Sequence, residues 1–151
     1  ITTTSDFRNS YSITGFCGVD NPQSPLYFHI HEESNDSFVF GANIEYAAQI
    51  GFLRRGDVLV LDNAAIHSKG DNQDLEQYMW DVFGVFILFL PTRSPELNPI
   101  ELVWRMLVRR LHSYELSFIR DRDACFYAAV SILQSITVRD VEACYKEQGY
   151  L

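Results

Sequence analysis

The chain has 151 residues and a formal net charge of −8, with 20 acidic against 12 basic side chains. Hydrophobic residues make up 47% of it, which supports one folded domain and excludes a disordered tail. No run of Lys and Arg is present, which excludes a polycationic nucleic-acid binder. No apolar stretch reaches the roughly 18 residues of a membrane span, and no signal peptide is visible. The three cysteines lie far apart, which favours reduced thiols in an intracellular protein.

The first part of the chain predicts a hairpin, a helix and a buried strand. Residues 11–19 alternate in the manner of a strand, turn formers fill 20–25, and residues 26–30 form a second strand. Apolar residues then recur at near-helical spacing from 37 to 53. The next apolar run, Val58 to Leu61, stops at Asp62. Such a run is typical of a strand that is buried on both faces of a sheet.

The second part predicts one more strand and four helices. In chain order we expect a helix over 72–83, a strand over 85–90, a proline-rich loop over 91–99, and helices over 100–112, 121–135 and 138–147. Thr137 is the expected N-cap of the last helix. The order indicates a mixed α/β sheet, with an antiparallel hairpin at its edge and a right-handed parallel crossover. Ligands of such folds collect at the carboxyl ends of the strands.

Two carboxylates follow neighbouring strand units of this predicted sheet. Asp62 ends the first apolar strand, and Glu101 opens the helix after the proline-rich loop. Each has a structural explanation, since Asp is a common turn residue and an acidic side chain suits a helix N-terminus. Together they lie at one edge of the sheet, where two carboxylates plus substrate phosphates are ligands that magnesium prefers. A pair of such ions can promote displacement at a phosphodiester.

Two sequence blocks resemble a known family. Residues 60–67, VLDNAAIH, and residues 90–104, LPTRSPELNPIELVW, strongly resemble the downstream signature blocks of the Tc1/mariner and IS630-like transposases. These are DDE-superfamily enzymes with an RNase H-like core, and the resemblance covers about residues 11–111. It implies an RNase H-like mixed sheet with flanking helices. Residues 1–151 would then be a partial catalytic domain, with a core over about 11–112 and a helical part over 113–151.

The resemblance also implies the catalytic residues. Asp62 matches the second carboxylate of the family and Glu101 the third, and both would hold Mg²⁺ or Mn²⁺, with two ions in the complete enzyme. Glu96, inside the proline-rich loop, is the alternative for the third position. Neither Asp6 nor Asp20 matches the first carboxylate. We therefore expect the central strand that carries the first Asp to be missing from this chain.

Further residues surround these positions. By the resemblance, Asn63, His67 and Asn98 would shape the site, although a turn or a structural hydrogen bond explains the first two equally well. Arg105 and Arg109 lie one helical turn apart after Glu101 and are candidates for DNA phosphate contacts, with a solvated helix face as the alternative. Trp104 is expected in the core. His29 and His31 face one side of a strand, but no fourth ligand supports a zinc site.

The function implied by the resemblance is that of a DNA transposase. It would hydrolyse phosphodiesters at transposon ends with metal ions and then transfer a strand to target DNA. The implied partners are the transposon ends, the target DNA and a second copy in the full-length protein, without a membrane. The location would be the nucleus in a eukaryotic host and otherwise the cytoplasm. The alternative is a catalytically inactive, transposase-derived module that binds DNA or another protein, which the net charge of −8 favours.

Overall fold

The computed structural model describes residues 11–21, 24–32, 37–62, 69–91, 93–113 and 122–151 of the chain. Its elements are β1 (Ser12–Cys17), β2 (Leu26–His31), α2 (Ser37–Gln49), β3 (Val58–Leu61), α3 (Lys69–Tyr78), the π-helical turn η1 (Met79–Phe83), β4 (Phe86–Phe89), the 3₁₀ turn η2 (Pro95–Leu97), α4 (Ile100–Leu111), α6 (Arg122–Ser135) and α7 (Val138–Glu147). The predicted order of strands and helices is confirmed. Within these ranges no helix has the length and apolarity that a membrane crossing requires.

Two predicted helix boundaries were wrong. The helix expected over 37–53 ends at Gln49, because Gly51 adopts a left-handed backbone with φ of 85° that stops the helix. The helix expected over 72–83 begins earlier, at Lys69, and changes to a π-helical turn at Met79. Gly84 then ends this turn, again with positive φ.

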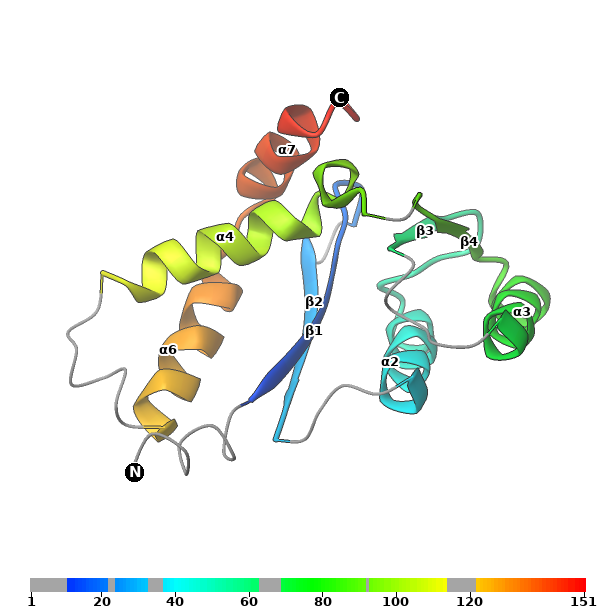
Figure 1. Ribbon diagram of the computed structural model, residues 1–151, viewed down its shortest axis with the longest axis horizontal. Helices are drawn as coiled ribbons and strands as arrows, with labels where there is room; N and C mark the ends of the chain where they lie inside the picture. The colour runs from blue at the N-terminus through cyan, green and yellow to red at the C-terminus, as the bar shows by residue number, and fades with distance from the viewer. Residues whose placement is uncertain (1–10, 22–23, 33–36, 63–68, 92, 114–121) are drawn as a thin grey trace.

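The strands form two sheets of two strands each (Figure 1). β1 and β2 pair antiparallel, from Ser12 opposite His31 to Cys17 opposite Leu26. β3 and β4 pair parallel, starting with Val58 opposite Phe86. The sequence predicted a mixed α/β sheet without its central strand, and the structure has both the antiparallel and the parallel pairing of such a sheet. In the described residues the hairpin and the parallel pair are separate sheets, because β1 and β3 are not hydrogen-bonded neighbours.

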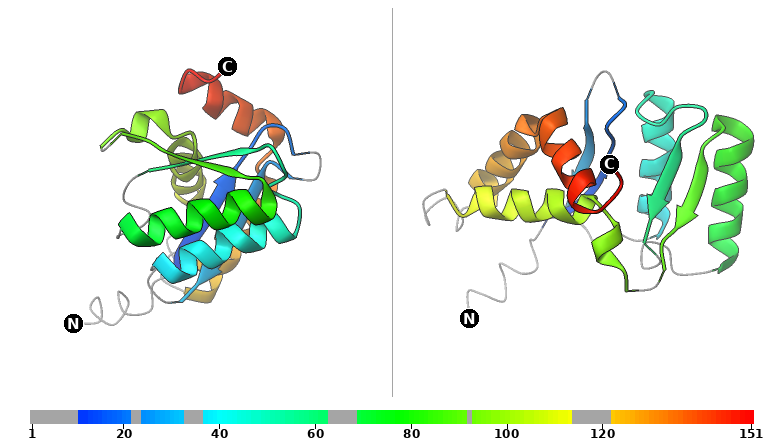
Figure 2. Two further views of the ribbon diagram at one scale, coloured as in Figure 1. Left: turned by 90° about the vertical axis from the view of Figure 1, so that its right-hand side faces the viewer. Right: turned by 90° about the horizontal axis from the view of Figure 1, so that it is seen from above.

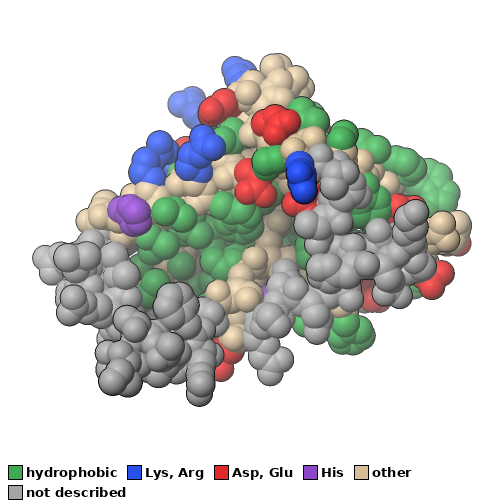
Figure 3. All heavy atoms as spheres, viewed as in Figure 1, with side chains coloured by type: hydrophobic (Ala, Val, Ile, Leu, Met, Phe, Trp, Pro, Cys, Tyr) green, Lys and Arg blue, Asp and Glu red, His purple; other side chains and the backbone are tan. Residues whose placement is uncertain are grey.

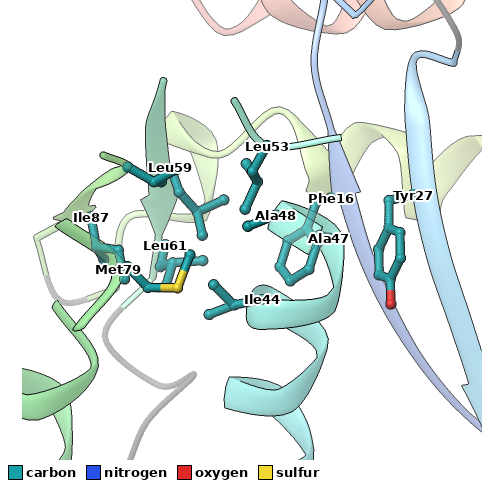
Figure 4. Packing of buried hydrophobic residues seen from close by; sticks show 11 residues of the cluster. Phe16, Tyr27, Ile44, Ala47, Ala48, Leu53, Leu59, Leu61, Met79 and Ile87 are labelled. Atoms are coloured by element: carbon teal, nitrogen blue, oxygen red, sulfur yellow. The ribbon is translucent and has the colours of Figure 1, made fainter. Parts of the chain in front are cut away.

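Helices cover the two sheets from different sides. α4, α6 and α7 lie against one face of the β1–β2 hairpin, whereas α2 and α3 lie side by side below the β3–β4 pair (Figures 1 and 2). Two buried clusters result. The α2 core joins the hairpin to the parallel pair (Figure 4) and contains Phe16, Tyr27, Ile44, Ala47, Ala48, Leu53, Leu59, Leu61, Met79, Val85 and Ile87. The α4 core contains Leu26, Leu102, Val103, Leu107, Ala129, Ile132, Leu133, Ile136, Val141 and Cys144.

The parallel strands are buried on one face only. Leu59, Leu61 and Ile87 point into the α2 core. Val58 and Phe86, on the other face, are 55% and 50% exposed. The prediction that the Val58–Leu61 run is buried on both faces was therefore wrong. An apolar run indicates a strand, but it does not show whether a second layer of helices covers it.

The predicted cap of the last helix is confirmed. The Thr137 hydroxyl accepts a hydrogen bond from the Asp140 backbone N–H at 3.2 Å, and the Asp140 carboxylate accepts one from the Thr137 N–H at 2.9 Å. Arg110 of α4 approaches the same carboxylate at 3.4 Å. The capping box fixes the start of α7, and the ion pair with Arg110 links that start to α4.

Candidate active site

Asp62 stands at the carboxyl end of β3. The Leu90 N–H donates to the Leu61 carbonyl at 2.7 Å, which closes the β3–β4 ladder immediately before Asp62. Since Leu59 and Leu61 are buried in the α2 core, the end of the strand is fixed on that side. The Asp62 side chain is partly buried there.

Glu101 is positioned by a tightly folded loop. The buried residue Asn98 donates its N–H to the Pro95 carbonyl at 3.0 Å and accepts the Glu101 N–H on its own carbonyl at 3.1 Å. Pro99 precedes the first turn of α4, where its fixed φ suits a helix start. Leu102 and Val103 are buried in the α4 core, which leaves Glu101 partly exposed in the first helical turn.

One cavity brings these residues together. It has a volume of about 400 Å³ and lies between the β1–β2 hairpin and β3. Asp62, Asn98 and Glu101 all line it. The structure therefore places three of the predicted site residues in a single cavity, called the site cavity below. Asn63 and His67, which were also predicted to shape the site, lie outside the described residues.

The charged residues Arg54 and Asp57 line the other end of the site cavity, near the start of β3. The Arg54 guanidinium donates to the Asp20 carbonyl at 2.8 Å, and the Asp57 carboxylate accepts the Arg54 N–H at 2.8 Å. The Asn21 amide also donates to the Phe52 carbonyl at 3.1 Å. These bonds place the end of β1 beside the start of β3, so the two strands run in opposite directions. Asp20 is therefore near the start of β3, away from Asp62 at its end.

Trp104 forms one wall of the site cavity. A Cβ atom built on Gly15 would lie 2.5 Å from Cη2 of Trp104, so the indole ring packs directly on the backbone of β1. The ring also packs against the α4 core, which agrees with the structural role expected for it. Because Trp104 is three residues after Glu101 on α4, this contact helps to set where Glu101 lies.

Two tyrosines from the C-terminal end also line the site cavity, and the sequence analysis missed both. The Tyr145 hydroxyl donates to the Cys17 carbonyl at 2.9 Å, and the Tyr150 hydroxyl donates to the Leu97 carbonyl. Burial raises the pKa of the Cys17 thiol to about 12 and also raises the pKa of Tyr145. No local pattern could have indicated contacts between residues so distant in the chain.

The outer face of α4 borders a second, open groove. Glu101, Arg105, Arg109 and His112 line it together with exposed apolar residues, which include Leu97 and Val108. Basic side chains gather along α4 on this face of the molecule (Figure 3). Arg105 and Arg109, both predicted, are exposed here. His112 was not predicted to belong to this face, although its position three residues after Arg109 places it on the same side of the helix.

Among the described residues, no group of three or more His, Cys, Asp or Glu side chains is placed to hold a metal ion. His29 and His31 stack on β2 with ring centroids 5.5 Å apart. Asp62 and Glu101 thus offer two carboxylates to the site cavity, one from the end of β3 and one from the start of α4.

Comparison with protein families matches residues 8–124 to one family model, described as DDE superfamily endonuclease. The match includes β3, the proline-rich loop and α4, and with them Asp62 and Glu101. The mixed α/β arrangement is consistent with the RNase H-like fold of such enzymes, which generally use divalent metals and bind DNA. No curated protein and no solved structure matches the chain.

Proposed function

The chain belongs to the DDE superfamily endonucleases, and we propose that it acts as part of a Tc1/mariner- or IS630-like transposase catalytic domain. Its reaction is hydrolysis of a DNA phosphodiester at transposon ends, followed by attack of the freed 3′-hydroxyl on target DNA. The observation that carries this proposal is that Asp62 and Glu101 line the same cavity. The two residues come from separate rigid elements, as a site for an extended DNA substrate requires.

The residues present fit a magnesium or manganese ion. Carboxylate oxygens are hard ligands, and magnesium in phosphate-processing sites is usually held by one or two carboxylates plus substrate phosphates. When bound, a pair of divalent ions lowers the pKa of the attacking water or hydroxyl and stabilises the leaving oxygen. Asp62 and Glu101 would hold these ions. Asn98 keeps Glu101 in place by accepting its backbone N–H.

The groove on α4 would hold the DNA backbone next to the reaction centre. Glu101, Arg105 and Arg109 recur every four residues, so they lie along one face of the helix, and all three line the groove. Guanidinium groups bind phosphate in a bidentate manner and remain charged at all relevant pH values. A DNA strand along this face would therefore pass directly from its phosphate contacts to Glu101. This local basic strip would give DNA a positively charged contact on a chain whose net charge is −8.

The experiment is metal-dependent nicking of supercoiled plasmid DNA by a protein that contains residues 1–151. Asp62→Asn and Glu101→Gln should each abolish nicking with Mg²⁺ and with Mn²⁺. Asp74→Asn is the matched control, because Asp74 is an exposed carboxylate of α3 that lines neither the site cavity nor the groove on α4. It should retain nicking. Full activity in Asp62→Asn or Glu101→Gln, or its loss in Asp74→Asn, would overturn the assignment of the two carboxylates.

The second candidate function is a non-catalytic module that binds DNA through α4. It is favoured by the finding that the described residues place fewer than three metal-binding side chains together. Mn²⁺ binding separates the two functions, since it broadens the NMR signals of nearby nuclei. Broadening of Asp62 and Glu101 resonances, lost in either carboxylate variant, supports the catalytic proposal. DNA binding without such broadening supports the module.

A further inference from the structure

A Schellman turn ends α7 and fixes the direction of Tyr150. The Tyr150 N–H donates to the Tyr145 carbonyl at 2.9 Å. The Gly149 N–H donates to the Lys146 carbonyl at 3.1 Å, and Gly149 supplies the left-handed backbone that the motif requires, with φ of 85°. The rings of Tyr145 and Tyr150 meet edge to face with centroids 5.7 Å apart, which is the side-chain contact that often accompanies the motif. Residues 148–150 are called the α7 turn below.

The α7 turn directs Tyr150 to the loop that leads to Glu101. The Tyr150 hydroxyl donates to the carbonyl of Leu97, which is the last residue of η2. Asn98 follows directly, and its carbonyl accepts the Glu101 N–H at 3.1 Å. Figure 1 shows the C-terminal end of the chain beside the turn that precedes α4. One hydrogen bond and a short stretch of backbone thus connect Tyr150 to Glu101, and both residues line the site cavity.

The backbone bonds within η2 set its shape but not its place in the molecule. The Leu97 N–H donates to the Ser94 carbonyl at 3.0 Å. The Asn98 N–H donates to the Pro95 carbonyl at the same distance. Bonds between residues three apart close a tight turn, and they move with that turn as a unit. The bond from Tyr150 differs from them, because it joins the turn to a separate helix.

α7 gives this bond a firm base. Val141 and Cys144 are 0% and 3% exposed, and both lie in the α4 core. The ion pair between Asp140 and Arg110 adds a second link from α7 to α4. α7 therefore packs on the same helix that Glu101 begins. The α7 turn consequently holds the loop relative to α4 itself.

We propose that Tyr150 is a positioning residue for Glu101. The Tyr150 hydroxyl holds the Leu97 carbonyl, and the loop in turn holds the Glu101 carboxylate at one place in the site cavity. This role rests on the proposed function, in which the Glu101 carboxylate holds a metal ion. It also goes beyond the family match, because that match covers residues 8–124 and does not include the α7 turn.

Amide hydrogen exchange, measured by NMR without metal, gives the first test. Tyr150→Phe keeps the ring contact with Tyr145 and removes only the hydroxyl. A neutral hydrogen bond shifts a local opening equilibrium by roughly fivefold, so the Glu101 amide should exchange about fivefold faster in this variant. Gly149→Ala should have the same effect, because a Cβ there meets no atom within 4 Å and acts only through the positive φ.

Two variants serve as controls for this exchange measurement. Asp140→Ala weakens the capping box at the start of α7, away from the α7 turn. Tyr127→Phe removes a hydroxyl from an exposed side chain of α6. Neither should change the exchange rate of the Glu101 amide. Unchanged exchange in Tyr150→Phe, or an equal acceleration in Asp140→Ala, would overturn the proposal.

Mn²⁺ affinity and nicking kinetics give the second test. In Tyr150→Phe the Kd of Mn²⁺, measured by electron paramagnetic resonance, should rise severalfold, because the Glu101 carboxylate is in place for less of the time. The kcat of nicking should fall while KM for DNA stays the same, since Arg105 and Arg109 of the groove are not moved. Faster Glu101 exchange with unchanged Mn²⁺ affinity would overturn the positioning role. Faster exchange in a chain that binds no Mn²⁺ even as wild type would support the link between Tyr150 and Glu101 and would overturn the proposed function instead.

Discussion

Gly15→Ala tests whether α4 lies on β1 as described. In the structure the added Cβ would lie 2.5 Å from Cη2 and 2.9 Å from Cζ2 of Trp104. Ordinary contacts of a Cβ atom are 3.4–4 Å, so the indole ring must retreat by about 1 Å. Retreat is resisted, because the neighbouring residue Val103 is fully buried in the α4 core. Overpacking of this kind costs roughly 1–3 kcal/mol of unfolding free energy.

The assay is urea denaturation of paired variants. Gly18→Ala is the matched control, since a Cβ there meets no atom within 4 Å, and its effect should stay within about 0.5 kcal/mol. Trp104→Phe removes the ring atoms that the new Cβ would strike. Gly15→Ala should therefore cost much less in that background, with a coupling free energy of about 1–2 kcal/mol. Equal losses in both backgrounds would refute the packing of Trp104 on Gly15, and with it the placement of α4.

Three further predictions concern charge, capping and burial. Replacing Arg105 and Arg109 together by Ala should reduce the slope of log DNA affinity against log salt concentration by roughly 2. Arg139→Ala is the control, because Arg139 is exposed on α7 outside the groove, and it should leave the slope unchanged. An unaltered slope in the double variant would reject the phosphate role. The pKa of Asp140 is lowered, chiefly by the hydrogen bond from the backbone N–H of Thr137, the N-cap of α7. The ionised Asp140 carboxylate therefore stabilises the fold at pH values above its ordinary pKa of about 3.9. This stabilisation is lost as the pH falls through the lower pKa of the folded state. Asp140→Ala should accordingly cost about 1 kcal/mol at pH 7 and clearly less at pH 2.5 in urea titrations, and equal costs at both would contradict this. Burial raises the pKa of the Cys17 thiol to about 12, so iodoacetamide at pH 8 should leave Cys17 unmodified in the native chain and alkylate it in urea. Peptide mass spectrometry measures the labelling. Equal labelling under both conditions would show that the thiol is not buried in the fold.

Local patterns were sufficient to predict the elements that carry the candidate site. The apolar run before Asp62 is short and bounded by turns, so it could be identified as a strand from the sequence. Pro99 marks the start of α4 by its fixed φ, and this located Glu101 in the first helical turn. The N-cap role of Thr137 could also be predicted, because a capping box depends on residues only three positions apart.

Features that depend on distant pairings could not be predicted. The separation of β1 from β3 depends on backbone edges that belong to different parts of the chain, and hydrophobic periodicity carries no information about register between them. The contact of Tyr145 with Cys17 joins opposite ends of the described chain. The exposure of Val58 and Phe86 depends on which face the helices cover, a property of tertiary packing rather than of the strand itself.

The two carboxylates of the candidate site are held by different cores. Asp62 follows a strand of the α2 core, whereas Glu101 begins a helix of the α4 core. The β1–β2 hairpin contributes to both, with Phe16 in the first core and Leu26 in the second. The separation of Asp62 and Glu101 is therefore set by how the hairpin packs in the two cores. Since the proposed pair of metal ions would sit about 4 Å apart, correct packing of the hairpin in both cores is a condition of the proposed chemistry.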